Sequence, residues 1–150
     1  LVGITPGAGF VTPAAGMAIG AITGLLCYFS VQLKVSLRFD DSLDTFAVHG
    51  VGGTIGAILT GVFASAELIS SHPAGQVLAE NGRFALIGGQ FQAVLVAYGL
   101  AALGTLLIAA VLRGLGMPFR VPEEAENLGV DVREHGEEAY AERIGSPQFH

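Results

Sequence analysis

Three long apolar stretches restrict what this chain can fold into. They cover about residues 13–33, 42–64 and 84–112, and a helix needs roughly 20 apolar residues to cross a hydrocarbon core. Charged residues make up 13% of the chain, against about 25% in soluble domains. The pattern predicts an all-α, polytopic membrane helix bundle, with a transmembrane portion over residues 1–112 and a tail over residues 113–150.

The acidic excess of the chain is confined to the tail. Five acidic and five basic residues balance in residues 1–120, whereas beyond residue 120 eight acidic residues face only Arg133 and Arg143. An acidic segment repels the phosphates of nucleic acid, so nucleic-acid binding is excluded. The single cysteine, Cys27, lies in an apolar run and indicates neither a disulfide nor a thiolate metal site. No cofactor is expected.

The chain begins Leu-Val-Gly, without an initiator methionine or a basic leader, so we interpret it as part of a longer protein. Basic residues retained on the cytoplasmic side set the orientation of membrane spans. Lys34 and Arg38 follow the first stretch, and Arg113 and Arg120 follow the third. The C-terminus is therefore predicted to be cytoplasmic.

Glycines in the first two stretches predict close helix packing. Gly16, Gly20 and Gly24 recur every four residues, which forms one small-residue stripe expected to meet another helix. In the second stretch Gly50 and Gly53 would weaken a helix in water, but they permit tight crossings in a bundle.

The ends of the second stretch are predicted from polar residues. Ser42 is expected to cap the helix through its hydroxyl, and Asp44 to complement the positive end of the helix. For Asp44 this structural interpretation is preferred over a role in transport. Residues 65–83 are polar and contain Pro73 with two glycines, so they are predicted to be a loop.

His49 is the residue that most points to function. It and Asp44 are the only ionisable side chains between residues 42 and 64, and a polar group in hydrocarbon needs a partner or a cavity. At helical spacing His49 shares a face with Thr45, Phe46 and Gly53. Two interpretations stay open from the residues alone: a structural imidazole donating to a carbonyl, or an imidazole lining a passage. No metal site is predicted, because neighbouring spans lack further ligands at suitable spacing.

Four strings of residues carry a family resemblance. DDSLDTFAVHGVGG over residues 40–53 closely resembles the penultimate span of the Amt/Mep/Rh ammonium transporters. Similar matches are GITPGAGFV over residues 3–11, LTGVFA over 59–64, and RVPEE over 120–124 followed by EHGEEAY over 134–140. All lie in the family's order, and the tail is most similar to the microbial Amt branch.

The resemblance implies a bundle of about eleven spans in two inverted halves, of which these are the last three. It also implies a homotrimer in the plasma or inner membrane. His49 would be the second of two histidines facing each other in a narrow apolar pore, with Thr45 and Phe46 beside it. Asp44, Gly50 and Gly53 would be structural residues near that pore.

The implied function is transport in which ammonium is deprotonated and ammonia is conducted. Alternatives with the same fold are a non-conducting ammonium sensor and a Rh-type ammonia channel. The resemblance also implies a regulatory tail that binds a PII-type protein at the cytoplasmic face. Its residues would be Glu134, His135, Gly136, Glu137 and Tyr140.

Overall fold

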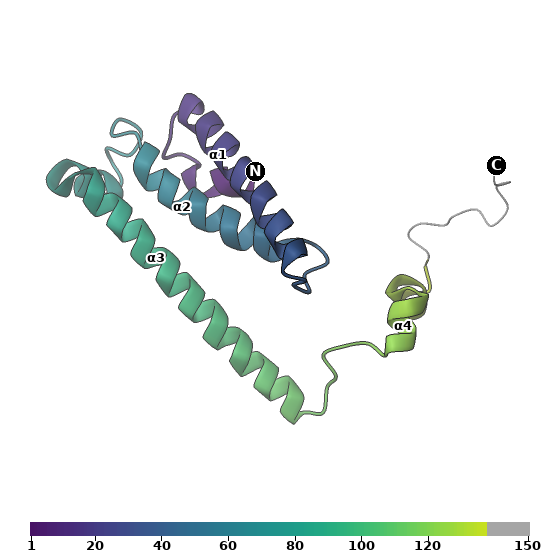
Figure 1. Cartoon of the computed structure of the whole chain (residues 1–150). Helices are drawn as coiled ribbons and strands as arrows, with labels where there is room; N and C mark the ends of the chain where they lie inside the picture. The colour runs from purple at the N-terminus through teal and green to yellow at the C-terminus, as the bar shows by residue number, and fades with distance from the viewer. Residues whose placement is uncertain (138–150) are drawn as a thin grey trace, which may run out of the picture. The chain divides into compact units, whose positions relative to one another are not determined.

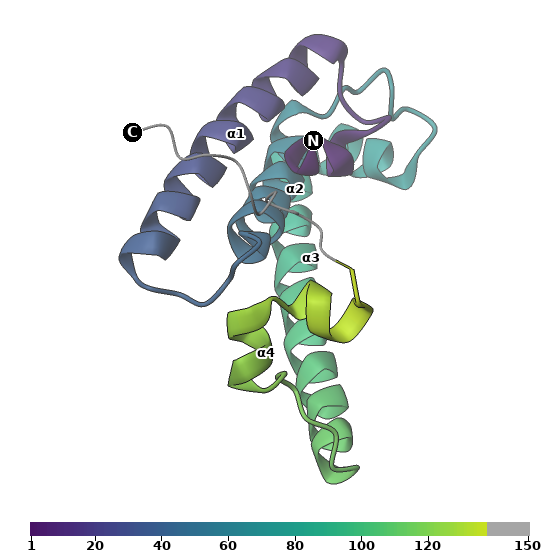
Figure 2. The same cartoon turned by 90° about the vertical axis from the view of Figure 1, so that its right-hand side faces the viewer.

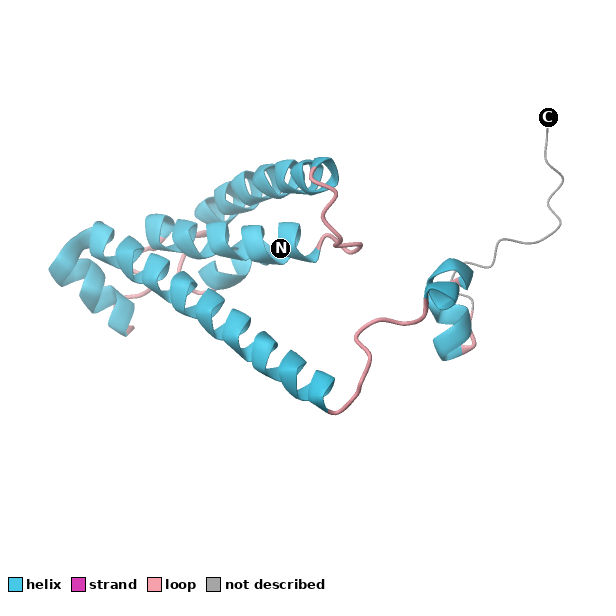
Figure 3. Cartoon of the chain, turned by 60° about the horizontal axis from the view of Figure 1, so that its bottom comes forward, coloured by secondary structure: helices cyan, strands magenta, loops and turns pink. Residues whose placement is uncertain are grey.

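The computed structural model describes residues 1–137 and contains only helices and loops over that range (Figure 3). The elements in chain order are η1 (Val2–Gly7), α1 (Pro13–Ser36), η2 (Phe46–Val51), α2 (Gly52–Phe63), α3 (Pro73–Gly114), α4 (Glu123–Leu128) and η3 (Asp131–His135) (Figure 1). The chain forms two compact units that divide between Ala101 and Ala102, within α3. The predicted edge of the transmembrane portion, after residue 112, stays a prediction.

Within residues 1–137, three helical segments are long and apolar enough to cross a membrane, namely Pro13–Ser36, Phe46–Phe63 and Pro73–Gly114. They overlap the three predicted spans, although the third begins at Pro73 rather than near residue 84. The predicted all-α membrane fold is confirmed. Large apolar side chains such as Leu25, Leu95 and Leu103 are exposed on α1 and α3. Such surfaces suit lipid or further helices rather than water.

Helix α1 begins at a side-chain cap. The Thr12 hydroxyl accepts a hydrogen bond from the Ala15 backbone N–H at 3.4 Å, and Pro13 occupies the first turn, where its missing N–H costs nothing. The helix ends at Ser36, three residues beyond the predicted limit. Of its glycine stripe, Gly16 packs near Ile4, whereas a Cβ added at Gly20 or Gly24 would meet no described atom within 4 Å. That another helix packs against Gly20 and Gly24 therefore stays a prediction.

The second span begins at a different residue from the one predicted. The backbone N–H groups of Thr45 and Phe46 both donate to the Asp41 carboxylate, each at 2.9 Å. The prediction of Ser42 as the cap is therefore wrong, because a carboxylate offers two oxygens and satisfies two amides at once. Asp44 adopts a left-handed conformation with φ 55° just before the helix, and its side chain pairs with Lys34 instead.

The short helix η1 contacts both α2 and α1, and it lies near α2 at the N-terminus of the chain (Figure 2). Its approach to α2 is close enough that a Cβ added at Gly56 would collide with the Gly3 carbonyl oxygen. Gly3 itself is buried against Thr23 of α1. Glycine at both positions therefore permits the backbone contact on which the packing of the three helices depends.

Helix α3 starts inside the segment predicted to be a loop. Pro73 lies at its first position, the place where proline suits a helix, and the His72 Nδ1 accepts from the Ala74 N–H at 3.1 Å. The loop prediction for residues 65–83 is thus wrong for its second half. At Gly82, with φ 79° and ψ 176°, the helix is interrupted and then resumes.

Arg83 joins the third span to the end of the second. Its Nη1 donates to the carbonyl oxygens of Gly61, Val62 and Ala64 at 3.3, 2.6 and 3.1 Å. These are carbonyls at the C-terminus of α2, which lack partners within the helix. A guanidinium there satisfies them and complements the negative end of the helix dipole. Nearby, Ala64, Ile69 and Leu86 form a small buried core.

The second unit contains the tail helices. Arg120 binds Glu126 of α4 with two hydrogen bonds, Nε to Oε1 at 2.6 Å and Nη2 to Oε2 at 3.0 Å. This contact lowers the pKa of the Glu126 carboxyl. Ala125 of α4 is completely buried, and α4 contacts η3.

Candidate functional site

His49 lies in η2, a π-helical turn that leads directly into α2. A π-turn contains an extra residue per turn, is rare, and occurs frequently at functional sites. Ala47 of this turn is buried, whereas the His49 side chain is exposed in this chain. The imidazole therefore emerges from an irregular point of a membrane-spanning segment rather than from a regular helix.

An open hollow of about 420 Å³ lies beside His49. It is lined from η2 and α2 by His49, Gly50, Gly53, Thr54 and Ala57, and from α3 by Ala93, Val94, Ala97, Tyr98 and Ala101. Most of these residues are small and apolar, so the backbones of α2 and α3 border the space directly. A small ligand in this hollow would meet few polar groups besides the imidazole.

The other polar groups of the hollow are joined to one another. The Gly50 carbonyl accepts from the Thr54 hydroxyl at 2.7 Å and from the Tyr98 hydroxyl at 3.1 Å. The two hydroxyl oxygens are 2.9 Å apart. Tyr98 thus brings a polar group of α3 to the residue that follows His49.

The structure brings some of the predicted site residues together and separates others. Gly50 and Gly53 line the hollow with His49. Phe46 instead lines a second hollow, of about 250 Å³, with Lys34 and Leu37. The edge of the Phe46 ring also lies so close to Gly50 that a Cβ there would be 2.9 Å from it.

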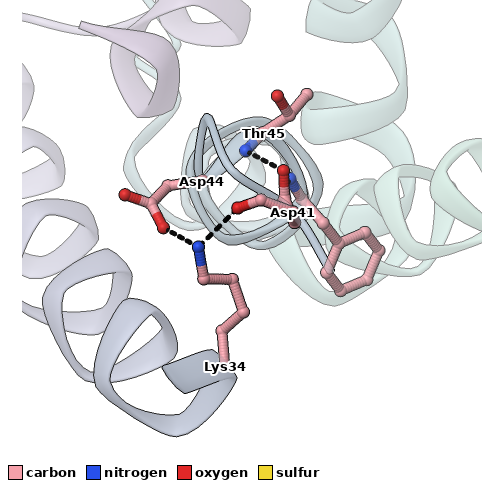
Figure 4. A network of polar contacts seen from close by, with 5 residues as sticks. Lys34, Asp41, Asp44 and Thr45 are labelled. Atoms are coloured by element: carbon pink, nitrogen blue, oxygen red, sulfur yellow. Dashed lines mark hydrogen bonds and ion pairs between the residues drawn. The ribbon is translucent and has the colours of Figure 1, made fainter. Parts of the chain in front are cut away.

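Thr45 and Asp44 lie at the start of the span, next to the contacts of Lys34. The Lys34 ammonium donates to the Asp44 carboxylate and to the Asp41 backbone carbonyl (Figure 4). Asp41 in turn holds the backbone of Thr45. The bonds from the Phe46 and Thr45 amides, together with the charge of Lys34, lower the pKa of the Asp41 carboxyl. This set of residues fixes the end of α1 to the beginning of η2.

Sequence reasoning missed Tyr98, Thr54 and the partnership of Lys34. Tyr98 did carry a signal, because it is a residue with a polar tip in the middle of an apolar stretch, where a hydroxyl needs a partner. The π-turn itself had no recognisable sequence signal. Over the described residues, no group of three His, Cys, Asp or Glu side chains lies close enough to hold a metal ion.

The predicted regulatory residues fall at the end of the described chain. Glu134 and His135 belong to η3, and Gly136 follows in a left-handed conformation with φ 66°. Glu134 lines a hollow of about 240 Å³ with Arg120 and Pro122. Glu137 is exposed, and Tyr140 lies outside the described residues.

Comparison with known proteins decides the family. The sequence profile of the Ammonium Transporter Family matches residues 1–140. The chain belongs to this family. It is 42% identical to an ammonium transporter of Bacillus subtilis over 96% of this chain and 35% of the relative. It is 36% identical to the ammonium transporter MEP2 of Saccharomyces cerevisiae over 95% of this chain and 30% of the relative.

An ammonium transporter, Amt1, of the archaeon Archaeoglobus fulgidus is 36% identical over 93% of this chain and 34% of its own length. The chain therefore spans about a third of the length of these curated relatives. No solved structure was found to match significantly. Family membership and three helices of spanning length identify a multi-pass membrane protein, and its named relatives are transporters rather than enzymes.

Proposed function

We propose that this chain forms the last three spans of an ammonium transporter and that His49 lies on its conduction path. The observation that carries the proposal is the position of the imidazole. It lies on a membrane-spanning segment of a family member and borders a hollow of small, apolar residues. Among the described helices His49 is exposed, and it lines this hollow with residues of α2 and α3.

The chemistry of ammonium explains why a histidine is useful there. Removing a bare cation from water into an apolar passage is expensive, whereas neutral ammonia crosses more cheaply when a ring nitrogen offers it a hydrogen bond. In the proposed mechanism ammonium is recruited outside and deprotonated, ammonia passes His49, and the proton is relayed. Thr45 and Phe46 are proposed to lie on the cytoplasmic side of this passage, with Asp44, Gly50 and Gly53 shaping the backbone around it.

The test is His49→Ala in the full-length protein, reconstituted in liposomes and assayed for ammonium-dependent current and uptake. We expect flux or selectivity to be altered or lost while the protein still folds, because the nitrogen that meets ammonia is gone. His72→Ala is the matched control, since its imidazole lies before Pro73 and outside the hollow. Unchanged flux and selectivity in His49→Ala would overturn the pore assignment, and wild-type protein that binds ammonium without flux would indicate a sensor.

We further propose that the protein is a homotrimer in the plasma or inner membrane with a cytoplasmic C-terminus. The segment from Glu134 to Tyr140 is proposed to gate transport and to bind a PII-type regulator. Deleting residues 121–150 should reduce uptake without preventing membrane insertion, which surface labelling measures separately. Undiminished uptake would contradict a gating role for the tail.

A further inference from the structure

We infer that Tyr98 is a positioning residue for His49. Its hydroxyl holds the Gly50 carbonyl at the end of the π-turn, and this contact sets the direction in which the imidazole enters the hollow. The inference rests on the proposed function for its effect on transport, but the contact itself is a property of the described helices.

The three oxygens of this cluster lie within hydrogen-bond distance of one another. Thr54 bonds the Gly50 carbonyl from one turn further along the same helix, a contact that depends on local geometry alone. Tyr98 is 48 residues from Gly50 in sequence and reaches it from α3. The Tyr98 bond is therefore the one by which the third span acts on the second at this point.

The backbone around His49 needs such a restraint. Gly50, Gly52 and Gly53 follow the histidine almost consecutively, and glycine is the most flexible residue and, after proline, the poorest helix former. The helix also changes here from π to α geometry, which shifts the register of its backbone hydrogen bonds. The Tyr98 hydroxyl gives the carbonyl at this point a donor from outside its own helix.

The restraint acts next to the imidazole. Gly50 is bonded directly to His49, and both line the same hollow as Tyr98. When the hydroxyl of Tyr98 is removed, the Gly50 carbonyl keeps Thr54 but loses its tie to α3. The π-turn then gains freedom, and the imidazole samples directions that do not face the hollow.

The experiment compares Tyr98→Phe, Thr54→Val and Tyr28→Phe in the full-length protein. Tyr98→Phe deletes one oxygen and keeps the ring. Tyr28→Phe is the matched control, because Tyr28 is exposed on α1 with its ring against Phe29. We measure the ¹⁵N chemical shifts and tautomer ratio of the His49 imidazole in histidine-labelled protein, assigned by comparison with His49→Ala, and then the maximal rate and half-saturation of ammonium uptake.

Tyr98→Phe is expected to shift the His49 resonances and to lower the maximal rate about 2- to 10-fold, the effect of losing one hydrogen bond, with half-saturation unchanged. Thr54→Val should act in the same direction, and the double variant should lose less than the product of the single losses, because both hydroxyls act on one carbonyl. Tyr28→Phe should match the wild type. A purely structural role for Tyr98 would lower the amount of folded protein but leave the rate per folded molecule unchanged.

Unaltered His49 resonances in Tyr98→Phe would overturn the inference, whatever happens to transport. Altered resonances in a protein whose wild type does not conduct would instead contradict the proposed function and leave the positioning contact standing. The two failures are therefore distinguishable.

Discussion

The second membrane span is held in two different ways along its length. At its two ends the contacts are charged: Lys34 with Asp41 and Asp44 where the span begins, and Arg83 on the last carbonyls of α2. Between these ends, from Gly50 beside His49 to Thr54, the contacts are neutral hydroxyl bonds from Thr54 and Tyr98. A charge at the centre of a bilayer is costly, whereas near the edges water and lipid headgroups stabilise it. The charged contacts of this span therefore lie near its ends, where a charge is well solvated, and the contacts between them are made by uncharged hydroxyl groups.

The largest effect is expected from placing a charge in the middle of the span. Thr54→Lys replaces a hydroxyl of the hollow by an ammonium that has no carboxylate partner among the described side chains lining it. A lysine at the centre of a membrane helix costs about 3 kcal/mol on insertion scales. We expect strongly reduced insertion, measured by surface labelling and by the yield of folded protein.

Ser42→Lys is the matched control for that variant, because Ser42 is exposed and precedes the span. It should insert as the wild type does. Equal insertion of Thr54→Lys and Ser42→Lys would show that the middle of this span is not the apolar region that the comparison requires.

The next largest effect is expected where the second span ends, at the contacts of Arg83. Arg83→Met keeps an unbranched side chain but removes the donors that satisfy three carbonyls at the end of α2. Arg83 is exposed, so we expect a loss of about 1–2 kcal/mol in the free energy of unfolding, measured in detergent with the full-length protein. Arg113→Met, at the last turn of α3, is the control and should change it less.

A smaller effect is expected where the span begins. Lys34→Met removes the cation that bonds the Asp44 carboxylate and the Asp41 carbonyl. Because this pair is only partly exposed to solvent, we expect a loss of about 1 kcal/mol, near the upper range for accessible ion pairs. Lys34→Arg should restore most of it. If Lys34→Met unfolded with the same free energy as the wild type, the contacts of Lys34 would not contribute to stability.

The smallest effect is a pH dependence at Asp41. Its ordinary pKa is 3.8, and the Phe46 and Thr45 amides lower the pKa in the folded protein. Above pH 3.8 the carboxylate is charged in both the folded and the unfolded protein, and its contribution to folding stability is complete. This contribution is lost as the pH falls through the lower pKa of the folded protein. The thermal midpoint should therefore fall on acidification below about pH 4. Asp41→Asn should weaken this fall, and an identical acid dependence would contradict the role of Asp41 as the cap.

Apolar length was enough to predict the three spans, because a membrane accepts few other solutions. The residues at the ends of the spans were less informative about where each helix begins. Serine and aspartate are both good caps, so Ser42 and Asp41 were both possible from the sequence. Only the path of the folded backbone brings the Asp41 carboxylate to the amides of Thr45 and Phe46. Pro73 was interpreted as a loop residue although it also suits a helix start, and here the helix prevails.

The candidate site was likewise predicted only in part. The ionisable side chain in an apolar span singled out His49, and the glycines around it indicated a place where helices approach closely. The helical spacing also placed Phe46 on the face of His49, whereas the structure has them lining separate hollows. A π-turn changes the angular relation between residues, so an argument from α-helical periodicity does not hold across it.

The sequence by itself determined that the described chain has three stretches long and apolar enough to span a membrane, which of them carries the histidine, and which family the chain belongs to. These features depend on local composition and on strings of neighbouring residues. Only the tertiary structure decided that Tyr98 meets the Gly50 carbonyl and that Arg83 closes the end of α2. Such contacts join residues distant in the chain, and they exist only after the helices have packed and fixed the direction of each side chain.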